Sequence, residues 1–404
     1  MRKITSDTLI YVGGELLVKL FPFVLLPILS RALGPEGYSD ISLFNTYVSI
    51  LFIFIGINTS SAVIQFYFVP NGLKDSDYFN ASLIIVLLIT ILFLFISAIF
   101  FSNAIFLLAV LTTSLQCIYT NLLSQQQARK EAKNYLVIQV SNAIISFVFT
   151  LLLLAYLPIT YKSRVYAVSA SYLVSILISI YLSKQYFNTS TKVDITVAIK
   201  RLCLFGFPLI IHNLSFFARS GLDRILIAKF YSKSLLGNYS AAFQLTVFIT
   251  VVLMAINKAM TPHIYENLKN HKYNLKFFNS IFVKYFLLCL LVTFVSYFLP
   301  HQLYEIITGK GYDYVKDISF LMVPAFLSQG FYMIMATTCM YFNENKKISY
   351  CTFTGGVIHA LLLYIVCLKL NIFYIPMVLL VSNIAISVLI YFAIFRKLNF
   401  HNVE

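Results

Sequence analysis

Runs of about twenty apolar residues recur from one end of the chain to the other. A run of that length is long enough to cross a bilayer, and it does so as a helix because a helix satisfies its own backbone hydrogen bonds. Only 11% of the 404 residues are charged, whereas an ordinary soluble domain is about 25% charged. The sequence therefore predicts an all-α integral membrane protein. Its twelve predicted spans lie near residues 9–30, 41–68, 80–101, 104–124, 135–157, 165–183, 203–228, 236–260, 279–299, 317–341, 350–370 and 373–395.

The basic residues are distributed unevenly between the two sides of the predicted membrane. If the N-terminus is cytoplasmic, 17 Lys and Arg residues lie in cytoplasmic segments and eight lie on the opposite side. Because cytoplasmic loops carry an excess of Lys and Arg, this bias predicts that both termini are cytoplasmic. The basic residues behind the net charge of +15 are thus placed according to membrane topology, and we expect no nucleic-acid partner. The N-terminal residues imitate a signal peptide, but the apolar run after them contains charges, so we expect it to be retained.

The most polar interruption, residues 182–202, falls near the midpoint and leaves six predicted spans on each side. A short repeat supports two related halves, because GYS at 37–39 and NYS at 238–240 both begin a span. Parallel halves are common in transporters, whose substrate path lies at the interface between them. We therefore expect two six-helix lobes around a central cavity. The expected parts are an N-terminal lobe (1–187), a cytoplasmic linker (188–200) and a C-terminal lobe (201–404).

Charged residues interrupt several of the predicted spans. Each costs on the order of 2.5–3.5 kcal/mol at the centre of a membrane helix, so it should face a protein interior or a water-filled cavity. Glu15 and Lys19 are four residues apart and share one helical face, which allows an ion pair. Arg219 and Asp223 have the same spacing in the seventh span. The charged residues within spans are Glu15, Lys19, Arg219, Asp223, Arg224, Lys258 and Lys284.

Two interpretations of these charges are open. In the first, the ion pairs hold neighbouring helices together, and Lys258 and Lys284 extend their stems to the membrane surface. In the second, the five cations outnumber the two acids, and the surplus charge suits an anion such as a phosphate or diphosphate. We favour the second, because unpaired buried cations are costly in a purely structural role. In it, Glu15 either holds Lys19 in place or exchanges a proton.

Motifs for other chemistry are absent from the sequence. The six cysteines have no C-x-x-C spacing and lie mostly in apolar runs, so we expect packing residues and neither disulfides nor a metal site. Nucleotide-binding glycine motifs and H-E-x-x-H are also absent. We expect no catalytic residue and no cofactor, with H⁺ or Na⁺ as the coupling ion if transport is driven. A lone membrane histidine usually makes one helix-to-helix hydrogen bond, and we expect this of His212 and His359.

Two segments carry recognisable motifs. The first outer loop contains R-x-L-G-P-x-x-Y, formed by Arg31, Leu33, Gly34, Pro35 and Tyr38. The second lobe begins with G-x-P-L-I, continues with D-R and ends with G-x-Y-S, formed by Gly206, Pro208, Asp223, Arg224, Gly237, Tyr239 and Ser240. In order and spacing these motifs resemble the polysaccharide-type flippases of the MOP exporter superfamily, also called Wzx-like or O-antigen flippases. Ser39 stands where that family usually has Gly.

The resemblance implies a MOP fold, similar to that of MATE transporters, and a specific activity. It implies a flippase that moves an undecaprenyl-diphosphate-linked oligosaccharide from the cytoplasmic to the periplasmic leaflet of a bacterial inner membrane, for O-antigen or another surface polysaccharide. It also implies alternating access, ion coupling, and a polysaccharide polymerase and chain-length regulator as partners. Arg31, Asp223 and Arg224 are the family-matched substrate-binding positions, although Arg31 could equally cap neighbouring carbonyls. The other candidate cavity residues rest on charge alone: Glu15, Lys19, Arg219 and Lys258.

Other function classes stay open at this point. An integral-membrane glycosyltransferase or polymerase would act on the same lipid-linked sugars, with Glu36 and Asp40 as catalytic carboxylates, but the outer loops are short for such an enzyme. A multidrug or metabolite antiporter of the same superfamily would favour acidic pockets, whereas these spans have a surplus of positive charge. A scaffold without transport is the third alternative. We therefore predict a transporter and not an enzyme.

Overall fold

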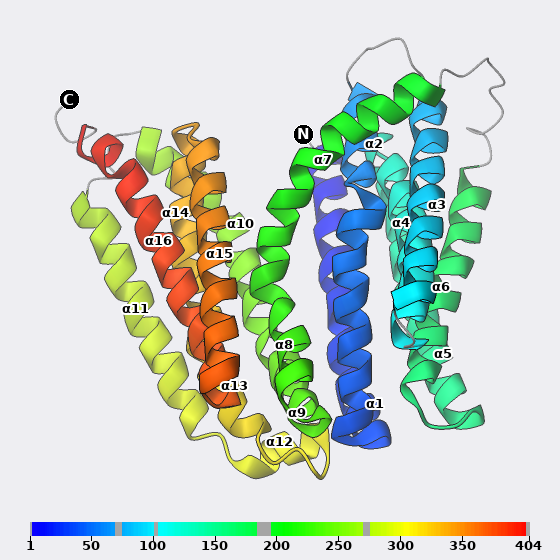
Figure 1. Cartoon of the computed structure of the whole chain (residues 1–404). Coiled ribbons are helices and arrows are strands. Elements are labelled where there is room, and N and C mark those ends of the chain that lie inside the picture. Colours follow the sequence, from blue (N-terminus) through cyan, green and yellow to red (C-terminus); the bar gives the residue numbers. More distant parts are fainter. Residues whose placement is uncertain (1, 69–74, 101–103, 184–194, 270–274, 401–404) are drawn as a thin grey trace. The chain divides into compact units, whose positions relative to one another are not determined.

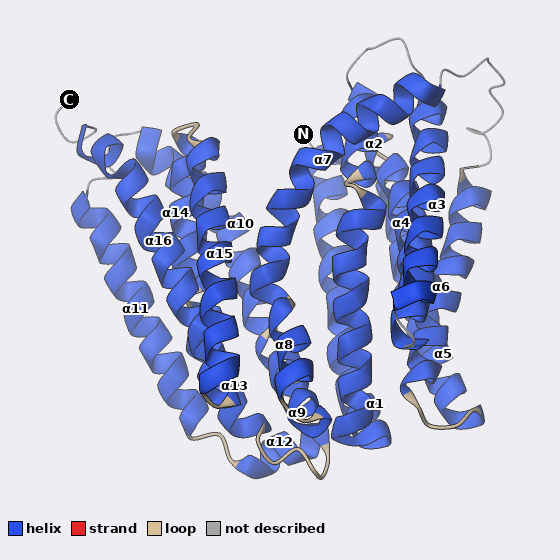
Figure 2. Cartoon of the chain, viewed as in Figure 1, coloured by secondary structure: helices blue, strands red, loops and turns tan. Residues whose placement is uncertain are grey.

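The computed structural model describes residues 2–68, 75–100, 104–183, 195–269 and 275–400 (Figure 1). Within these ranges every regular element is a helix (Figure 2), which confirms the predicted all-α class. The helices are α1 (Arg2–Gly56), α2 (Thr59–Phe68), α3 (Asp75–Phe100), α4 (Ala104–Ala128), α5 (Ala132–Tyr156), α6 (Tyr161–Leu182), α7 (Ile195–Ser220), α8 (Leu222–Phe230), α9 (Lys233–Thr246), α10 (Phe248–Lys269), α11 (Leu275–Tyr297), α12 (His301–Thr308), α13 (Val315–Leu327), α14 (Gln329–Tyr341), α15 (Asn345–Lys369), the short 3₁₀ helix η2 (Ile372–Tyr374) and α16 (Ile375–Phe400).

Eleven helical segments in the described part of the chain are long and apolar enough to cross a membrane. The first, Leu17–Gly56, is 40 residues long and contains a break, so it covers the first predicted span and most of the second. The others follow the order of the remaining predicted spans. This pattern agrees with the twelve predicted spans and makes the chain a multi-pass membrane protein.

The break in α1 lies at Gly34, whose φ of 65° and ψ of 179° are not helical. A positive φ strains most side chains, whereas glycine adopts it readily because it has no β-carbon. Pro35 follows at the start of the next helical segment, where its fixed φ suits the helix and its missing N–H loses no hydrogen bond. The two residues together therefore end one helix and begin the next.

The chain forms two compact units. They are Met1–Leu33 with Asp40–Leu214, and Gly34–Ser39 with Ser215–Glu404. The division falls inside α7, whereas most of the predicted linker at 188–200 lies outside the described residues, so the linker stays a prediction. The early turns of α7 belong to the first unit because Ala198 and Leu202 are fully buried in a cluster that includes Tyr78. Arg201 of the same turns donates a hydrogen bond to the Tyr78 hydroxyl at 3.0 Å.

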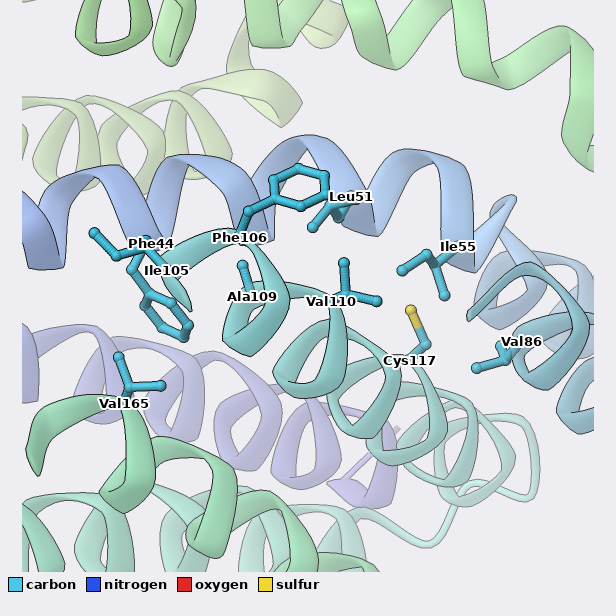
Figure 3. Close-up of a cluster of buried hydrophobic side chains, with 10 residues drawn as sticks. All are labelled: Phe44, Leu51, Ile55, Val86, Ile105, Phe106, Ala109, Val110, Cys117 and Val165. Atoms are coloured by element: carbon cyan, nitrogen blue, oxygen red, sulfur yellow. The ribbon is translucent and has the colours of Figure 1, made fainter. Parts of the chain in front are cut away.

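The main core of the first unit joins α1, α3, α4 and α6 (Figure 3). Its buried side chains are Phe44, Leu51, Ile55, Val86, Ile105, Phe106, Ala109, Val110, Cys117 and Val165. Lipid is as apolar as these side chains, so the cluster is held by close van der Waals packing more than by the exclusion of water. Large hydrophobic side chains are exposed on the outside of α3, including Leu88 and Phe95. This arrangement suits a helix that contacts lipid on one face.

The short segment Gly34–Ser39 packs within the second unit. A β-carbon at Gly237 of α9 would collide with the backbone of Pro35, so only glycine permits this approach. Tyr38 and Tyr312 are both buried nearby and interact electrostatically. The part of the first outer-loop motif from Gly34 to Tyr38 is therefore a packing element of the second unit, while Arg31 and Leu33 belong to the first.

Candidate functional site

A buried polar cluster lies where α7 ends and α8 begins, in the second unit. Gly221 interrupts the helix, and Asp223 follows in the first turn of α8 with an exposed fraction of 5%. One carboxylate oxygen of Asp223 accepts the backbone N–H of Arg224 at 2.9 Å. The other accepts the hydroxyl of Tyr239, on α9, at 2.6 Å. Hydrogen bonds to a carboxylate are stronger than neutral ones, so Asp223 fixes α9 against α8.

Arg224 is compensated by its neighbours. Its Nη1 atom lies 3.5 Å from Oδ1 of Asp223 and donates a hydrogen bond to the carbonyl of Ser220 at 2.6 Å. Its guanidinium also lies 3.9 Å from the centre of the Phe243 ring. The ion pair itself lies within α8, whereas the contacts of Asp223 with Tyr239 and of Arg224 with Phe243 join α8 to α9. A role for the pair in substrate binding stays a prediction.

Arg219, five residues earlier in the chain, has different surroundings. Its guanidinium lies 5.0 Å from the centre of the Phe216 ring and 6.0 Å from that of Tyr332, on α14. Its Nε atom is buried and has no hydrogen-bond partner. Among the described residues, it pairs with aromatic rings and with no carboxylate. Such a cation is suited to bind an anionic group, because a guanidinium offers several N–H donors in one plane.

His359 lies on α15 with an exposed fraction of 2% and joins the same cluster. Its Nδ1 atom is 3.0 Å from the hydroxyl of Ser382, on α16. The same hydroxyl lies 2.6 Å from the carbonyl oxygen of Val378, to which it can donate its proton. The geometry agrees with the predicted helix-to-helix hydrogen bond. Nε2 of His359 is buried without a partner, and the ring interacts electrostatically with Asp223 and Arg219.

The remaining candidate residues belong to other helices, α1 and α10. Lys19 and Arg31 belong to the first unit and are exposed, and Lys258, on α10 in the second unit, is exposed as well. The side chain of Glu15 lies outside the described residues, so its ion pair with Lys19 stays a prediction. The expectation that residues of the two units line one cavity is likewise untested and stays a prediction.

A further cation with buried hydroxyl partners is Arg164, one of the eight basic residues that the sequence analysis counted on the side opposite the cytoplasm. Arg164 lies in the first turns of α6, within a candidate span. Its Nη1 atom donates to the hydroxyls of Ser146 and Thr150, on α5, at 2.9 and 2.7 Å. The sequence signal was the pair of hydroxyl residues four positions apart on one helical face.

The interior of α4 is more polar than its hydropathy suggested. Asn121 is 1% exposed, accepts the hydroxyl of Thr59 at 3.1 Å and donates to that of Ser82 at 3.1 Å. Gln126 is fully buried and donates to Ser183 at 2.6 Å. These bonds join α4 to α2, α3 and the end of α6. In the sequence, they were indicated by polar side chains that recur at three- and four-residue spacing within 104–128.

The structure also describes the side chains that could hold a metal ion and the six cysteines. No group of three or more His, Cys, Asp or Glu side chains among the described residues is placed to hold a metal ion. The six cysteines are free thiols. Cys117 and Cys339 are members of buried hydrophobic clusters, as expected for packing residues.

Comparison with known proteins identifies the family. The family described as polysaccharide biosynthesis protein matches residues 4–268, and the MatE family matches residues 208–365. Protein 1 of the Lsg locus of Haemophilus influenzae is 29% identical over 394 residues, covering 96% of this chain and 98% of that protein. An uncharacterised membrane protein of the same organism is 30% identical over 360 residues, covering 88% of each chain.

Solved structures support the fold. An inward-facing multidrug resistance transporter of the MATE family and MOP superfamily has a TM-score of 0.70 at 16% identity, covering 95% of each chain. A MOP-superfamily transporter from Pyrococcus furiosus, described as having a binding pocket of reverse polarity, has a TM-score of 0.57 at 14% identity, covering 99% of this chain and 95% of that one. Fold and family together point to a transporter rather than a catalytic enzyme. The chain belongs to the polysaccharide biosynthesis protein family and is a multi-pass membrane protein with the fold of the MATE transporters.

Proposed function

We propose that this protein translocates an undecaprenyl-diphosphate-linked oligosaccharide from the cytoplasmic to the periplasmic leaflet of a bacterial inner membrane. The product would supply O-antigen or another surface polysaccharide. The family match supports a role in polysaccharide synthesis, and the apolar helices support a substrate that stays associated with the membrane. The excess of Lys and Arg in the loops assigned to the cytoplasm supports cytoplasmic termini.

Arg219 is the observation that carries the proposed substrate. Its guanidinium lies in a candidate span, with a buried Nε–H that lacks an acceptor and without a carboxylate partner among the described residues. A diphosphate supplies the anionic oxygens that such a group binds through charge-assisted hydrogen bonds. We propose that Arg219 binds the diphosphate during translocation.

The charge of the substrate determines how the membrane potential acts on its translocation. Moving one elementary charge across the membrane changes the free energy by about 2.3 kcal/mol per 100 mV. A diphosphate carries negative charge toward the periplasm, so the potential, which is negative inside, favours this step. We propose alternating access between the two lobes, with H⁺ or Na⁺ coupling to reset the empty protein. A polysaccharide polymerase and a chain-length regulator are the proposed partners on the periplasmic side.

Reconstitution of the full chain in liposomes tests the proposal. A fluorescent undecaprenyl-diphosphate oligosaccharide is loaded in the inner leaflet, and a membrane-impermeant reagent outside measures its exposure. Arg219→Ala should slow translocation about 10–100-fold, since a hydrogen bond to a charged group contributes roughly 1.5–3 kcal/mol. Arg219→Lys should give an intermediate rate, because lysine keeps the charge but not the planar donor array.

Lys284→Ala is the matched control, because Lys284 is an exposed membrane cation on α11. It should translocate at the wild-type rate. Wild-type translocation by Arg219→Ala would reject the role of Arg219. Transfer of sugars between lipids without translocation would reject the flippase itself.

A multidrug antiporter is the second candidate. The MatE match over residues 208–365 and the likeness to a multidrug resistance transporter favour it. In the same liposomes, uptake of an organic cation driven by a proton or sodium gradient, with no exposure of the lipid-linked oligosaccharide, would favour the antiporter over the flippase.

A further inference from the structure

His359 is a buried titratable group that the proposed function does not use. It lies on α15, within a candidate span, and is 2% exposed. Its Nδ1 atom lies 3.0 Å from the hydroxyl of Ser382, whereas its Nε2 atom is buried without a hydrogen-bond partner. A buried polar atom without a partner is costly in a purely structural role. The free nitrogen therefore points to a second role for this ring, beyond the bond to α16.

The contacts of α15 with α7 and α8 place His359 beside the two charges of the cluster. At one end, a β-carbon at Gly356 would collide with Ser215, near the end of α7, so the two helices touch there. At the other end, the ring of Tyr364 lies 6.0 Å from that of Phe230, in the last turn of α8 (Figure 1). His359 lies between these contacts, as do Arg219 and Asp223 on the other side. The ring accordingly interacts electrostatically with both of them.

Each helix around His359 contributes known groups to its electrostatic surroundings. The negative charge of Asp223 attracts a protonated imidazole ring and the positive charge of Arg219 repels it, and such forces are strong away from water. The other groups act through these two residues: Arg224 and Tyr239 contact Asp223, Cys367 interacts with Asp223, and Tyr332 lies beside Arg219. From α16 come the hydroxyl of Ser382 and no charged residue before Arg396.

The two charges differ in what balances them. Asp223 is held permanently by Arg224 and Tyr239. The guanidinium of Arg219 has only aromatic rings beside it among the described residues, and its buried Nε–H has no acceptor. An anion that binds Arg219 would offset its charge. The repulsion that acts on a protonated His359 therefore depends on whether Arg219 has bound an anion.

We propose that His359 takes up a proton at Nε2 when an anion binds Arg219. The inference rests on the proposed function, in which Arg219 binds the diphosphate of the substrate. The proton comes from water and adds to the lone pair of Nε2, while no bond of the anion breaks or forms. Ser382 can accept a hydrogen bond from Nδ1 while it donates to the carbonyl of Val378, so the protonated ring keeps its partner.

The coupling between proton and anion is reciprocal. If the anion strengthens the binding of the proton, the proton strengthens the binding of the anion by the same factor. The proton also balances part of the negative charge that a diphosphate brings to the candidate spans. This proton uptake belongs to the loaded protein and is separate from the ion coupling that resets the empty protein.

Calorimetric titration of the full-length protein in phosphatidylcholine nanodiscs tests the proposal. The probe is farnesyl sulfate, because a sulfate ester keeps its negative charge throughout the pH range used and does not itself take up a proton. Each titration is repeated in buffers that differ in their heat of protonation, which gives the number of protons taken up per anion bound. The wild type should take up at least about 0.5 proton per anion near pH 5.5 and bind the probe at least about fivefold more tightly there than at about pH 8.

His359→Gln should bind farnesyl sulfate without proton uptake and with the same affinity at both pH values. His263→Gln is the matched control, because His263 is an exposed histidine on α10, and it should behave as the wild type. Equal proton uptake by the wild type and His359→Gln would overturn the proposal. Failure of the wild type to bind the probe, or binding without proton uptake, would overturn it as well.

Nitrogen-15 NMR of the wild type, labelled at its six histidines, needs no substitution at His359 and gives the second test. On addition of farnesyl sulfate, one histidine ring should change from the neutral to the protonated form. Arg219→Gln should abolish this change, because the anion then has no guanidinium to bind. If none of the six rings of the wild type changes, the proposal is rejected.

The two proposals fail in different ways. If the wild type translocates the oligosaccharide lipid while His359 takes up no proton on anion binding, the coupling is overturned and the flippase stands. If anion binding is accompanied by proton uptake at His359 while no oligosaccharide lipid is translocated, the flippase fails and the coupled anion site is supported.

Discussion

Arg219 and Arg224 lie five residues apart at the junction of α7 and α8, yet they are held in opposite ways. Arg224 has a carboxylate at 3.5 Å, a backbone carbonyl at 2.6 Å and an aromatic ring at 3.9 Å. Arg219 has two more distant rings and a buried Nε–H without an acceptor. The contrast shows that two nearby membrane charges can have very different neighbours, one a carboxylate and the other only aromatic rings among the described residues.

The largest effect on stability is expected at Asp223. Asp223→Asn removes the charge that compensates Arg224, and breaking a buried ion pair on one side costs roughly 3–5 kcal/mol. The midpoint of thermal unfolding of the purified protein should fall clearly. Asp223→Asn combined with Arg224→Met should recover most of the loss, because neither charge then remains. An unchanged midpoint in the single variant would contradict the compensation of Arg224 by Asp223.

A smaller effect is expected from Tyr239→Phe. The hydroxyl of Tyr239 donates to the carboxylate of Asp223 at 2.6 Å, and the residue is buried. Loss of a hydrogen bond to a charged group should lower the free energy of unfolding by about 1.5–3 kcal/mol. Tyr231→Phe is the control, since its hydroxyl makes an exposed bond to the carbonyl of Leu370 at 2.8 Å. If denaturant titration gives equal losses in the free energy of unfolding for both variants, the charge of the Asp223 carboxylate does not strengthen its hydrogen bond.

Phe243→Leu should have a still smaller effect. Its ring lies 3.9 Å from the guanidinium of Arg224, and a partly desolvated cation–π contact contributes roughly 1–2 kcal/mol. Phe216→Leu removes the more distant ring beside Arg219, 5.0 Å away, and should cost less. Denaturant unfolding of the two variants in parallel measures the difference between their losses in the free energy of unfolding. A greater loss at Phe216 would reverse our account of how the two arginines are held.

The smallest effect on stability is expected at Arg219 itself. Arg219→Met removes a cation that no carboxylate in the described part of the chain compensates, so the free energy of unfolding should change by less than about 0.5 kcal/mol or rise. Arg224→Met should destabilise, because it leaves Asp223 buried without its partner. Calorimetry of the two variants decides the point. A strongly destabilised Arg219→Met would mean that Arg219 is structural.

Hydrophobic runs predicted most of the fold. Every predicted span is helical in its described part, although some are divided between two consecutive helices, because a long apolar run leaves the backbone no other way to satisfy its hydrogen bonds. The boundary between the compact units was not predicted, because it lies within α7 and depends on which core its turns enter. The lobes 1–187 and 201–404 accordingly stay a prediction.

The sequence marked charged residues of this cluster, but it did not give the contacts that they make. Spacing marked Arg219, Asp223 and Arg224 as membrane charges, but it could not show that Asp223 would bind Tyr239 from another helix. The contact of His359 with Ser382, 23 residues later, is of the same kind. Such contacts depend on how helices rotate against one another, which the pattern of a single helix does not contain. The hydrogen bonds of Arg164 to Ser146 and Thr150 of α5 are a further contact of this kind.

The insertion of Gly34–Ser39 into the second unit has a consequence for assembly. Pro35 precedes most of the first unit in the sequence, yet its backbone packs against Gly237. During synthesis, the segment Gly34–Ser39 has no packing partner until about two hundred further residues have been made. The halves of the polypeptide are therefore not independent folding modules: if they were produced as two chains, each would mature only in the presence of the other.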